Sequence, residues 1–260
     1  MIKKLVARFH HDFQQAIWQV LPVVENSTYW IETKAANTPD SYFHLIDAEG
    51  GQLLHQDIFL GEGVLASMLS ANARWLILQV FEDKQNPEHA KVWVFDVQLG
   101  EMSYEVPDFT FLHLAGDRLY GLHQLGEDRG AVYLDLLTGD MYPGAESPAA
   151  NKEDLLTVQL YEKGDEGFES IHTFLREKLG VSIHGMCEYL ETDSHIILSY
   201  YTEEKPVRNE LVCFDRAGQR CHQDILLPEV KGFALGTFIV VGDTLSYVKN
   251  KSEICFYSLA

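Results

Sequence analysis

The sequence is poor in basic residues and contains no long apolar run. Its 20 Lys and Arg residues stand against 39 Asp and Glu residues, which gives a formal net charge of −19. This charge repels nucleic-acid phosphates and anionic membrane surfaces, and no stretch approaches the about 18 apolar residues that a membrane-spanning helix needs. We therefore expect neither a nucleic acid nor a membrane as partner.

A secretory signal is also missing. The opening residues, MIKKLVARFHHDF, carry two lysines, but Arg8 and His10 interrupt the apolar stretch behind them, so no hydrophobic segment of a signal peptide develops. An acidic surface chiefly keeps a cytoplasmic protein soluble. These features predict an acidic cytoplasmic protein.

Cysteine is scarce, and the motifs of metal, nucleotide and nucleophilic chemistry are absent. No pair of cysteines has the C-x-x-C spacing of a structural zinc site. A disulfide between Cys213 and Cys221 across a hairpin is conceivable, but free buried thiols fit a reducing compartment better. Without a G-x-S-x-G elbow, Walker loop, dinucleotide fingerprint, H-E-x-x-H helix or EF-hand loop, we predict no cofactor. The four cysteines are Cys187, Cys213, Cys221 and Cys255.

The chain instead contains many short β-branched and aromatic runs between Gly, Asp and Asn clusters, a pattern typical of strands. Four segments share the order strand, Asp, turn, Gly, strand. The Asp caps the turn with its side chain, and the Gly accepts the positive φ that closes a bulged hairpin. The predicted turns lie at 47–51, 96–100, 135–139 and 215–218.

A polar turn residue precedes an apolar strand at five places, and their spacing indicates a repeat. The intervals between these residues are 46, 45, 76 and 50. Periods of about 40 to 50 residues with about four strands each are typical of a β-propeller. We therefore predict an all-β protein in which residues 1–260 form one propeller domain of five blades. The five residues are Asn26, Asn72, Asp117, Asp193 and Asp243.

The long interval predicts a helical insertion at about 144–180. Asp165 suits the N-cap of a helix over 167–179, and Gly180 suits the position after its end. We expect the apolar side of this helix to pack against the flank of the propeller. Its helically spaced apolar residues are Phe168, Ile171, Leu175 and Leu179.

The two ends of the chain are expected to complete one blade together. Residues 253–260 resemble the first strand of the repeated hairpins but have no strand after them, and residues 16–22 have the pattern of that missing strand. Pairing of 16–22 with 254–259 would remove two exposed sheet edges. It would also bury Trp18 in the seam.

Two resemblances bear on the fold. The segment LDLLTGDMY (134–142) is similar to the D-x-x-T-G core of the tryptophan-docking repeat in quinoprotein-type propellers. That resemblance implies the propeller fold without the quinone cofactor, because the docking Trp is mostly replaced and the vicinal disulfide and calcium ligands are missing. The equivalent position holds His55, Tyr104, Pro143 and His222.

The opening of the chain carries the second resemblance. IWQVLP (17–22) followed by WIETK (30–34) resembles an uncharacterised family of cytoplasmic Bacteroidetes proteins, known only as a domain of unknown function. The resemblance covers about the first hundred residues. It implies no activity.

The tripeptide His-Gln-Asp occurs twice, in GQLLHQDIFL (51–60) and in GQRCHQDILL (218–227). His55 and His222 each follow a turn glycine by four residues, where related repeats place an aromatic ring between blades. A structural role is therefore predicted for both copies. The alternative, in which His55 and Asp57 ligate a metal, requires side chains from different blades to converge.

Other polar residues are candidates for a site. His10 and Asp12 project to the same side of a strand and could ligate a metal together, or they line a turn. Glu32 lies in an apolar strand, where a raised pKa would suit acid or base chemistry; the alternatives are that it faces solvent or pairs with Lys34. Three further residues lie on the strands of later repeats that are equivalent to the strand of Glu32. By this analogy they are pocket candidates at the axial opening: His123, His195 and Tyr200.

Two classes of function follow. In the first, the protein is a non-catalytic interaction or ligand-binding propeller, with the insertion at 144–180 as a docking element and a protein or small molecule as partner. In the alternative, it is a hydrolase or lyase acting on a saccharide or lactone-like substrate at the axial opening. That chemistry would use Glu32, Asp57 or a histidine with a metal.

Overall fold

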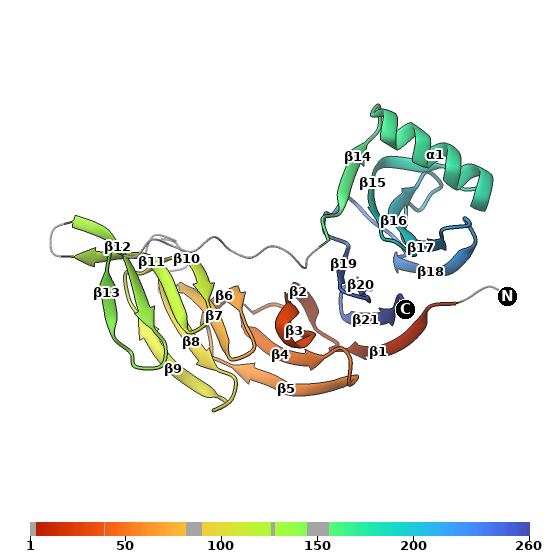
Figure 1. The fold of residues 1–260 in the computed structure, drawn as a ribbon. Coiled ribbons are helices and arrows are strands. Elements are labelled where there is room, and N and C mark those ends of the chain that lie inside the picture. Colours follow the sequence, from red (N-terminus) through yellow and green to blue (C-terminus); the bar gives the residue numbers. More distant parts are fainter. Residues whose placement is uncertain (1–3, 39, 82–89, 126–127, 145–155) are drawn as a thin grey trace. The chain divides into compact units, whose positions relative to one another are not determined.

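A computed structural model describes residues 4–38, 40–81, 90–125, 128–144 and 156–260. The chain divides into two compact units, one formed by residues 15–152 and the other by residues 1–14 together with 153–260. Strands dominate both units, and α1 (Glu166–Leu179) is the α-helix of the described residues (Figure 1). Each unit is described by itself below.

The unit of residues 15–152 contains three antiparallel sheets, each a meander of four strands. A short 3₁₀ helix, η1 (Val24–Asn26), joins the first two strands. The strands of the three sheets are β2 (Ala16–Val23), β3 (Thr28–Lys34), β4 (Ser41–Asp47) and β5 (Gln52–Phe59); β6 (Leu65–Ala71), β7 (Trp75–Phe81), β8 (Ala90–Asp96) and β9 (Glu101–Val106); and β10 (Thr110–Ala115), β11 (Arg118–Leu125), β12 (Asp128–Asp135) and β13 (Met141–Pro143).

The other unit contains two antiparallel sheets, in the orders β14-β15-β16-β17-β18 and β1-β21-β20-β19. The first has a fifth strand at its edge, and the second combines strands from both ends of the chain. The strands are β14 (Gln159–Glu162), β15 (Ile183–Glu191), β16 (His195–Thr202), β17 (Asn209–Asp215) and β18 (Arg220–Leu227), followed by β19 (Phe238–Val241), β20 (Thr244–Lys249), β21 (Glu253–Ser258) and β1 (Val6–Asp12).

Antiparallel meanders of four strands are the blades of a β-propeller. The described residues form four four-stranded sheets and one sheet with a fifth strand, at the spacing that the polar turn residues indicate. The predicted fold class, an all-β protein of the β-propeller type with five blades and one helical insertion, is therefore confirmed. That residues 1–260 act as one domain stays a prediction.

The four predicted hairpin turns are confirmed, and they are built alike. In each turn, one carboxylate oxygen of the Asp accepts hydrogen bonds from two backbone amides that follow it. The turn glycine has a positive φ of 62° to 79°, which a residue with a Cβ adopts at a cost. The residue pairs are Asp47 and Gly51, Asp96 and Gly100, Asp135 and Gly139, and Asp215 and Gly218.

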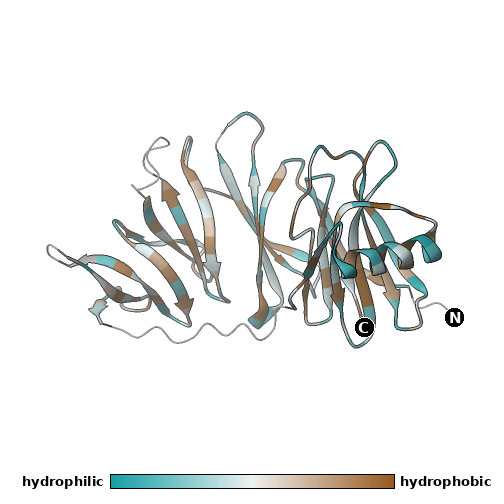
Figure 2. Cartoon of the chain, turned by 90° about the horizontal axis from the view of Figure 1, so that it is seen from above, coloured by the Kyte–Doolittle hydropathy of each residue, from teal (hydrophilic) through white to brown (hydrophobic). Residues whose placement is uncertain are grey.

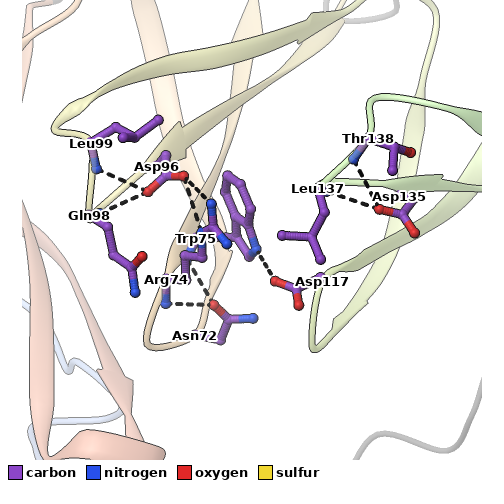
Figure 3. Close-up of polar contacts among 10 residues, drawn as sticks. All are labelled: Asn72, Arg74, Trp75, Asp96, Gln98, Leu99, Asp117, Asp135, Leu137 and Thr138. Atoms are coloured by element: carbon purple, nitrogen blue, oxygen red, sulfur yellow. Dashed lines mark hydrogen bonds and ion pairs between the residues drawn. The ribbon is translucent and has the colours of Figure 1, made fainter.

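The turn at Asp96 is the most strongly connected of the four (Figure 3). Its second carboxylate oxygen accepts hydrogen bonds from Nε and Nη2 of Arg74, at 3.2 and 3.0 Å. Asn72 caps the start of β7 by accepting from the amides of Arg74 and Trp75, and Nε1 of Trp75 donates to Asp117 at 2.8 Å. This network joins the sheet of β6 to β9 with the sheet of β10 to β13.

Apolar residues are spread along the strands of both units (Figure 2), and inner strands such as β3 and β7 are buried at most of their positions. Trp30 on β3 packs with Leu76 and Leu78 of the following sheet. In the other unit, Ile197 on β16 packs with Leu245 on β20 in the same way. The four cysteines are buried free thiols, and desolvation raises the pKa of Cys213 to about 12.

The terminal strands pair, as predicted, but the N-terminal partner differs from the predicted one. β1 pairs antiparallel with β21, from Val6 opposite Ser258 to Asp12 opposite Glu253. Residues 16–22 instead belong to β2 and open the sheet of β2 to β5.

The expected burial of Trp18 is wrong. Its side chain is 65% exposed, because the register of β2 against β3 shifts between Ile17 and Gln19 and leaves Trp18 at a bulge. The ammonium of Lys34 lies 4.2 Å from the centroid of the Trp18 ring.

The predicted helix is confirmed with a start at Glu166. Asp165 occupies the N-cap position, but its side chain accepts from the amide of Glu162 and makes no cap hydrogen bond. Gly180 ends the helix in the left-handed conformation. The insertion also contributes β14, which the sequence did not predict, and its segment 145–155 lies outside the described residues.

Candidate ligand-binding site

Glu32 is the predicted site residue with the most unusual environment. Its side chain is fully buried, and Oε1 accepts from Oγ of Ser41 at 3.0 Å and lies 3.5 Å from Nζ of Lys34. Oε2 has no hydrogen-bond partner among the described residues. Desolvation raises the pKa of Glu32, and Lys34 and Ser41 only partly offset that effect.

This burial makes a testable prediction. Because the folded-state pKa of Glu32 is raised, the folded protein binds its proton more tightly than the unfolded chain, and stability falls as pH rises through that pKa. We expect Glu32→Gln to stabilise the protein at pH 7.5 by on the order of 1–2 kcal/mol, with a gain that shrinks towards pH 4.5. Thermal unfolding across this pH range checks it, with exposed Glu62→Gln as control. A loss of stability at pH 7.5 would show that the ion pair with Lys34 outweighs the desolvation.

His123 and His195 lie in different surroundings. His123 on β11 has a buried Nδ1 without a hydrogen-bond partner in the described part of the chain, and its ring lies 6.3 Å from that of Phe109. His195 opens β16, where Oγ of Ser194 lies 2.8 Å from its Nδ1. Neither lies in a described pocket with Glu32.

Tyr200 is buried in a polar cluster of its own sheet. Its hydroxyl donates to Oε2 of Glu210 at 3.0 Å, and the same oxygen accepts from Nε2 of Gln223. Arg208 lies 3.3 Å from the other oxygen of Glu210. Desolvation, followed by the charge of Glu210, raises the pKa of Tyr200.

The strand register separates these candidates. On each strand, the residue that pairs with the turn Asp is counted as the first. Glu32 is then the fifth residue of its strand, whereas His123 and Tyr200 are each the sixth residue of theirs. Successive side chains point to opposite faces of a sheet, so Glu32 does not share an equivalent face with them. A site role for each of these residues stays a separate prediction.

Both His-Gln-Asp copies place the histidine between sheets, as predicted. The ring of His55 stacks parallel to Trp30 at 6.5 Å and meets Phe95 of the following sheet edge-on at 6.3 Å. The ring of His222 lies 4.3 Å from that of Tyr257 on β21.

The second copy continues into a polar network. Nε2 of His222 lies 2.9 Å from the hydroxyl of Tyr247, which donates to Asp224 at 3.0 Å. Lys249 donates to the other oxygen of Asp224 at 2.8 Å. Because the hydroxyl proton of Tyr247 is donated to Asp224, His222 donates to the oxygen of Tyr247. Desolvation lowers the pKa of His222.

The first copy forms a hydrogen bond with another histidine, the buried His44, which the sequence did not predict as a site residue. Asp57 donates its backbone amide to Nδ1 of His44 at 3.2 Å, so the proton of this ring lies on Nε2. Nε2 in turn lies 2.9 Å from Oγ1 of Thr33, which donates to Gln15 at 2.7 Å. The carboxylate of Asp57 is 3.8 Å from His44 and does not contact His55.

The remaining metal candidates are not brought together either. Nδ1 of His10 lies 3.1 Å from Glu253 on the neighbouring strand, while Asp12 accepts from the amide of Gln14. Within the described ranges, no group of three or more His, Cys, Asp or Glu side chains is placed to hold a metal ion.

A groove between α1 and the sheet of β14 to β18 is a candidate ligand site. Figure 1 shows the helix beside β14 and β15. The groove has a volume of about 440 Å³ and opens to solvent. One side of α1 forms its roof, through residues at helical spacings of three and four. The roof consists of Gly167, Ser170, Ile171 and Phe174, and the floor of Gln159, Tyr161, Tyr189, Glu191, Ile196 and Leu198.

The helix approaches the floor closely because Gly167 has no side chain. A Cβ at this position would lie 2.3 Å from the ring of Tyr161. The rings of Tyr161 and Tyr189 meet edge-on with centroids 6.2 Å apart. Gly167 therefore lets two tyrosine rings line the groove directly beneath the helix.

Polar groups gather at one end of the groove. The hydroxyl of Tyr189 donates to Glu191, which also forms an ion pair with Arg216. Desolvation and this hydrogen bond raise the pKa of Tyr189 to about 12. Glu191 and Arg216 also line a second hollow of about 670 Å³, together with Asp193 and Asp243.

Sequence reasoning missed this groove because its floor depends on β14, a strand of four residues. The pattern of α1 did contain a signal, since the small residues Gly167 and Ser170 lie one helical turn apart beside its apolar stripe. Small residues on a helix allow close approach, but they do not reveal what approaches.

Among the described residues, no helix is long and apolar enough to cross a membrane. Residues 24–104 match the model of a domain of unknown function, DUF4905. This match agrees with the resemblance of the N-terminal part to such a domain. A Bacteroidetes origin and a quinoprotein type stay predictions.

A comparison with curated proteins gave no match. Among solved structures, an uncharacterised protein from Listeria monocytogenes is similar at 10% identity and a TM-score of 0.38, with 99% of this chain and 98% of that chain covered. Prolyl oligopeptidase B from Galerina marginata gives 10% identity and a TM-score of 0.36, with 95% and 32% covered. The β-propeller domain of the Trilobed protease from Pyrococcus furiosus gives 9% identity and a TM-score of 0.35, with 94% and 67% covered.

Proposed function

We propose that this propeller-type protein is a non-catalytic binding protein that holds a small, largely apolar molecule in the groove beneath α1. The observation that carries the proposal is the groove itself, where the helix stands over aromatic and aliphatic side chains of β14, β15 and β16. Its volume lies within the range of small-molecule sites, which are mostly apolar with a few polar groups. A cytoplasmic location and a protein partner remain further expectations from the sequence.

The helix above the groove is held in place by buried contacts of its own. Phe168, Ile171 and Leu175 anchor α1 in a buried cluster with Leu198 and Tyr200. The roof is thereby held by its own apolar contacts, so a ligand need not order the helix when it binds.

A hydrolase or lyase centred on Glu32 is the alternative proposal. The raised pKa of Glu32 and its unpaired oxygen favour proton transfer. However, its side chain has no exposed surface, whereas the groove opens to solvent. The geometry therefore supports ligand binding in the groove more strongly.

Filling the groove tests the proposal. Ser170 lies on the groove side of α1 and Thr173 on its exposed side. We expect Ser170→Trp to weaken binding of a fluorescent naphthalene probe at least about tenfold, because the indole occupies the apolar volume. Thr173→Trp should change the affinity less than about twofold.

Fluorescence titration of both variants and the unmodified protein measures this difference, and circular dichroism verifies that each remains folded. Equal affinity of Ser170→Trp and the unmodified protein would overturn the proposed site.

A further inference from the structure

We propose that the ligand of this groove is an organic cation, an ammonium group carried on an apolar or aromatic body. This inference rests on the proposed function and adds the chemical class of the ligand. Three features carry it: the direction of the hydroxyl protons, the charges at the polar end, and the aromatic rings of the floor.

The hydroxyl groups of the groove already donate their protons to the protein. Tyr161 donates to Oε1 of Gln159 at 2.6 Å, and Ser170 donates to the backbone oxygen of Glu166 at 2.9 Å. The hydroxyl of Tyr189 donates to Glu191. Since a hydroxyl has one proton, these three groups present only oxygen lone pairs to a ligand.

Among the side chains that line the groove, only the amide of Gln159 retains polar hydrogens for a ligand. Glu191 adds carboxylate oxygens. The side chains of the groove therefore favour a ligand that donates hydrogen bonds over one that only accepts them. An ammonium group, with several donors and no acceptor, fits this pattern.

The charges at the polar end of the groove also favour a cationic ligand. Arg216 is paired with Glu191, and Arg8 is paired with Asp243 at 2.7 Å. Asp193 forms no hydrogen bond or ion pair through its side chain with another described residue, and it lies in the same hollow. The charge of Asp193 acts on Arg216, so two carboxylates, Glu191 and Asp193, share this one cation beside the groove.

Aromatic faces complete the match. Tyr161, Tyr189 and Phe174 line the apolar part of the groove. Cations are attracted to the faces of such rings, and the formal charge of −19 raises the local concentration of cations around the whole chain.

The test compares three probes with the same apolar body: 1-naphthylmethylamine, 1-naphthylmethanol and 1-naphthylacetate. We expect the amine to bind the unmodified protein at least about tenfold more tightly than the alcohol, which corresponds to about 1.4 kcal/mol, and the carboxylate to bind more weakly than both. Ser170→Trp should abolish the binding of all three.

A charge variant then locates the effect. Asp193→Asn should reduce the preference for the amine over the alcohol at least about threefold without changing the affinity for the alcohol. Glu177→Gln, at an exposed position of α1 that does not line the groove, serves as the control for the lost charge.

The outcomes separate the two proposals. If no probe binds, or if Ser170→Trp has no effect, the groove is not a ligand site and both proposals fail. If the alcohol or the carboxylate binds as tightly as the amine and Ser170→Trp blocks it, the groove is a ligand site but its ligand is not a cation. Loss of the amine preference in Glu177→Gln to the same extent as in Asp193→Asn would also overturn the cation inference.

Discussion

Removal of residues 1–12 is expected to lower the melting temperature by about 10 °C or more and to promote self-association. The deletion removes β1 and leaves the whole length of β21 as an unpaired edge. With a net contribution of about 0.5–1.5 kcal/mol for each hydrogen bond, the loss of this ladder amounts to several kcal/mol. An exposed edge strand is also a template for pairing with a second chain.

The side chain of Arg8 also holds β1 to the strands beside it. It donates to Oγ1 of Thr244 at 2.6 Å, to Asp243 at 2.7 Å and to Oγ of Ser258 at 3.2 Å. These bonds tie β1 to the start of β20 and the end of β21. The deletion breaks all of them together with the ladder.

Trp18→Ala supplies the matched control for the deletion. Because Trp18 is mostly exposed at a bulge, we expect its removal to cost less than about 1 kcal/mol. Calorimetry and sedimentation velocity measure both variants. If the deletion left a monomer with an unchanged melting temperature, or if Trp18→Ala were the more damaging change, the assignment of the terminal strand would be wrong.

Asp96→Ala is expected to destabilise the protein by about 3 kcal/mol. The side chain is 1% exposed, and its removal leaves two turn amides and the guanidinium of Arg74 without their acceptor. The side chain of Arg74 is 34% exposed, so its guanidinium regains only part of its hydration when the buried carboxylate is lost. Urea unfolding measures the change, with Asp135→Ala as control.

Asp135 caps an equivalent turn but makes no hydrogen bond or ion pair with a described arginine, and it lies closer to solvent. We expect its replacement to cost about 1 kcal/mol. Equal losses in the two variants would show that the bond to Arg74 contributes nothing beyond the turn itself.

The contribution of Asp96 also depends on pH. Burial acts to raise its pKa, but the hydrogen bonds from Arg74 and from the amides of Leu99 and Gln98 hold the pKa of Asp96 below its ordinary value of 3.8. For a lowered pKa, the stabilisation is fully present above the ordinary value and is lost as pH falls through the folded-state value. The difference between the unmodified protein and Asp96→Ala should therefore shrink only below about pH 4.

The sequence predicted those parts of the fold that depend on nearby residues. An Asp followed by a Gly three or four residues later defines each hairpin turn, because both capping and positive φ are local requirements. The helix predicted over 167–179, observed from Glu166, follows for the same reason, since its apolar spacing, N-cap position and terminal Gly180 are close together in the chain.

The features that the sequence did not predict depend on long-range pairing. Residues 6–12 and 16–22 both have the pattern of a short strand, and only the register against β21 distinguishes them. The two histidines in residues 6–12 make this segment look less like a strand. The bulge at Trp18 exposes an aromatic ring that the apolar pattern of residues 16–22 predicts to be buried.

The candidate groove was hidden for a related reason. β14 is too short to be recognised by periodicity, and the contact between Tyr161 and Gly167 joins a strand to a helix after an intervening turn. The hydrogen-bonded chain from Gln15 through Thr33 to His44 likewise depends on β3, β4 and the residue before β2, which come together only on folding.

A methyl-resolved NMR titration of the protein with 1-naphthylmethylamine tests the central claim most directly. Ile171 and Ile196 line the groove from the helix and from the sheet, whereas Ile77 is buried in the other unit and serves as an internal reference. The ligand-binding proposal predicts saturable shifts of the Ile171 and Ile196 methyl signals with no change at Ile77. Saturable shifts confined to methyl groups outside the groove, or no shifts at all, would contradict it.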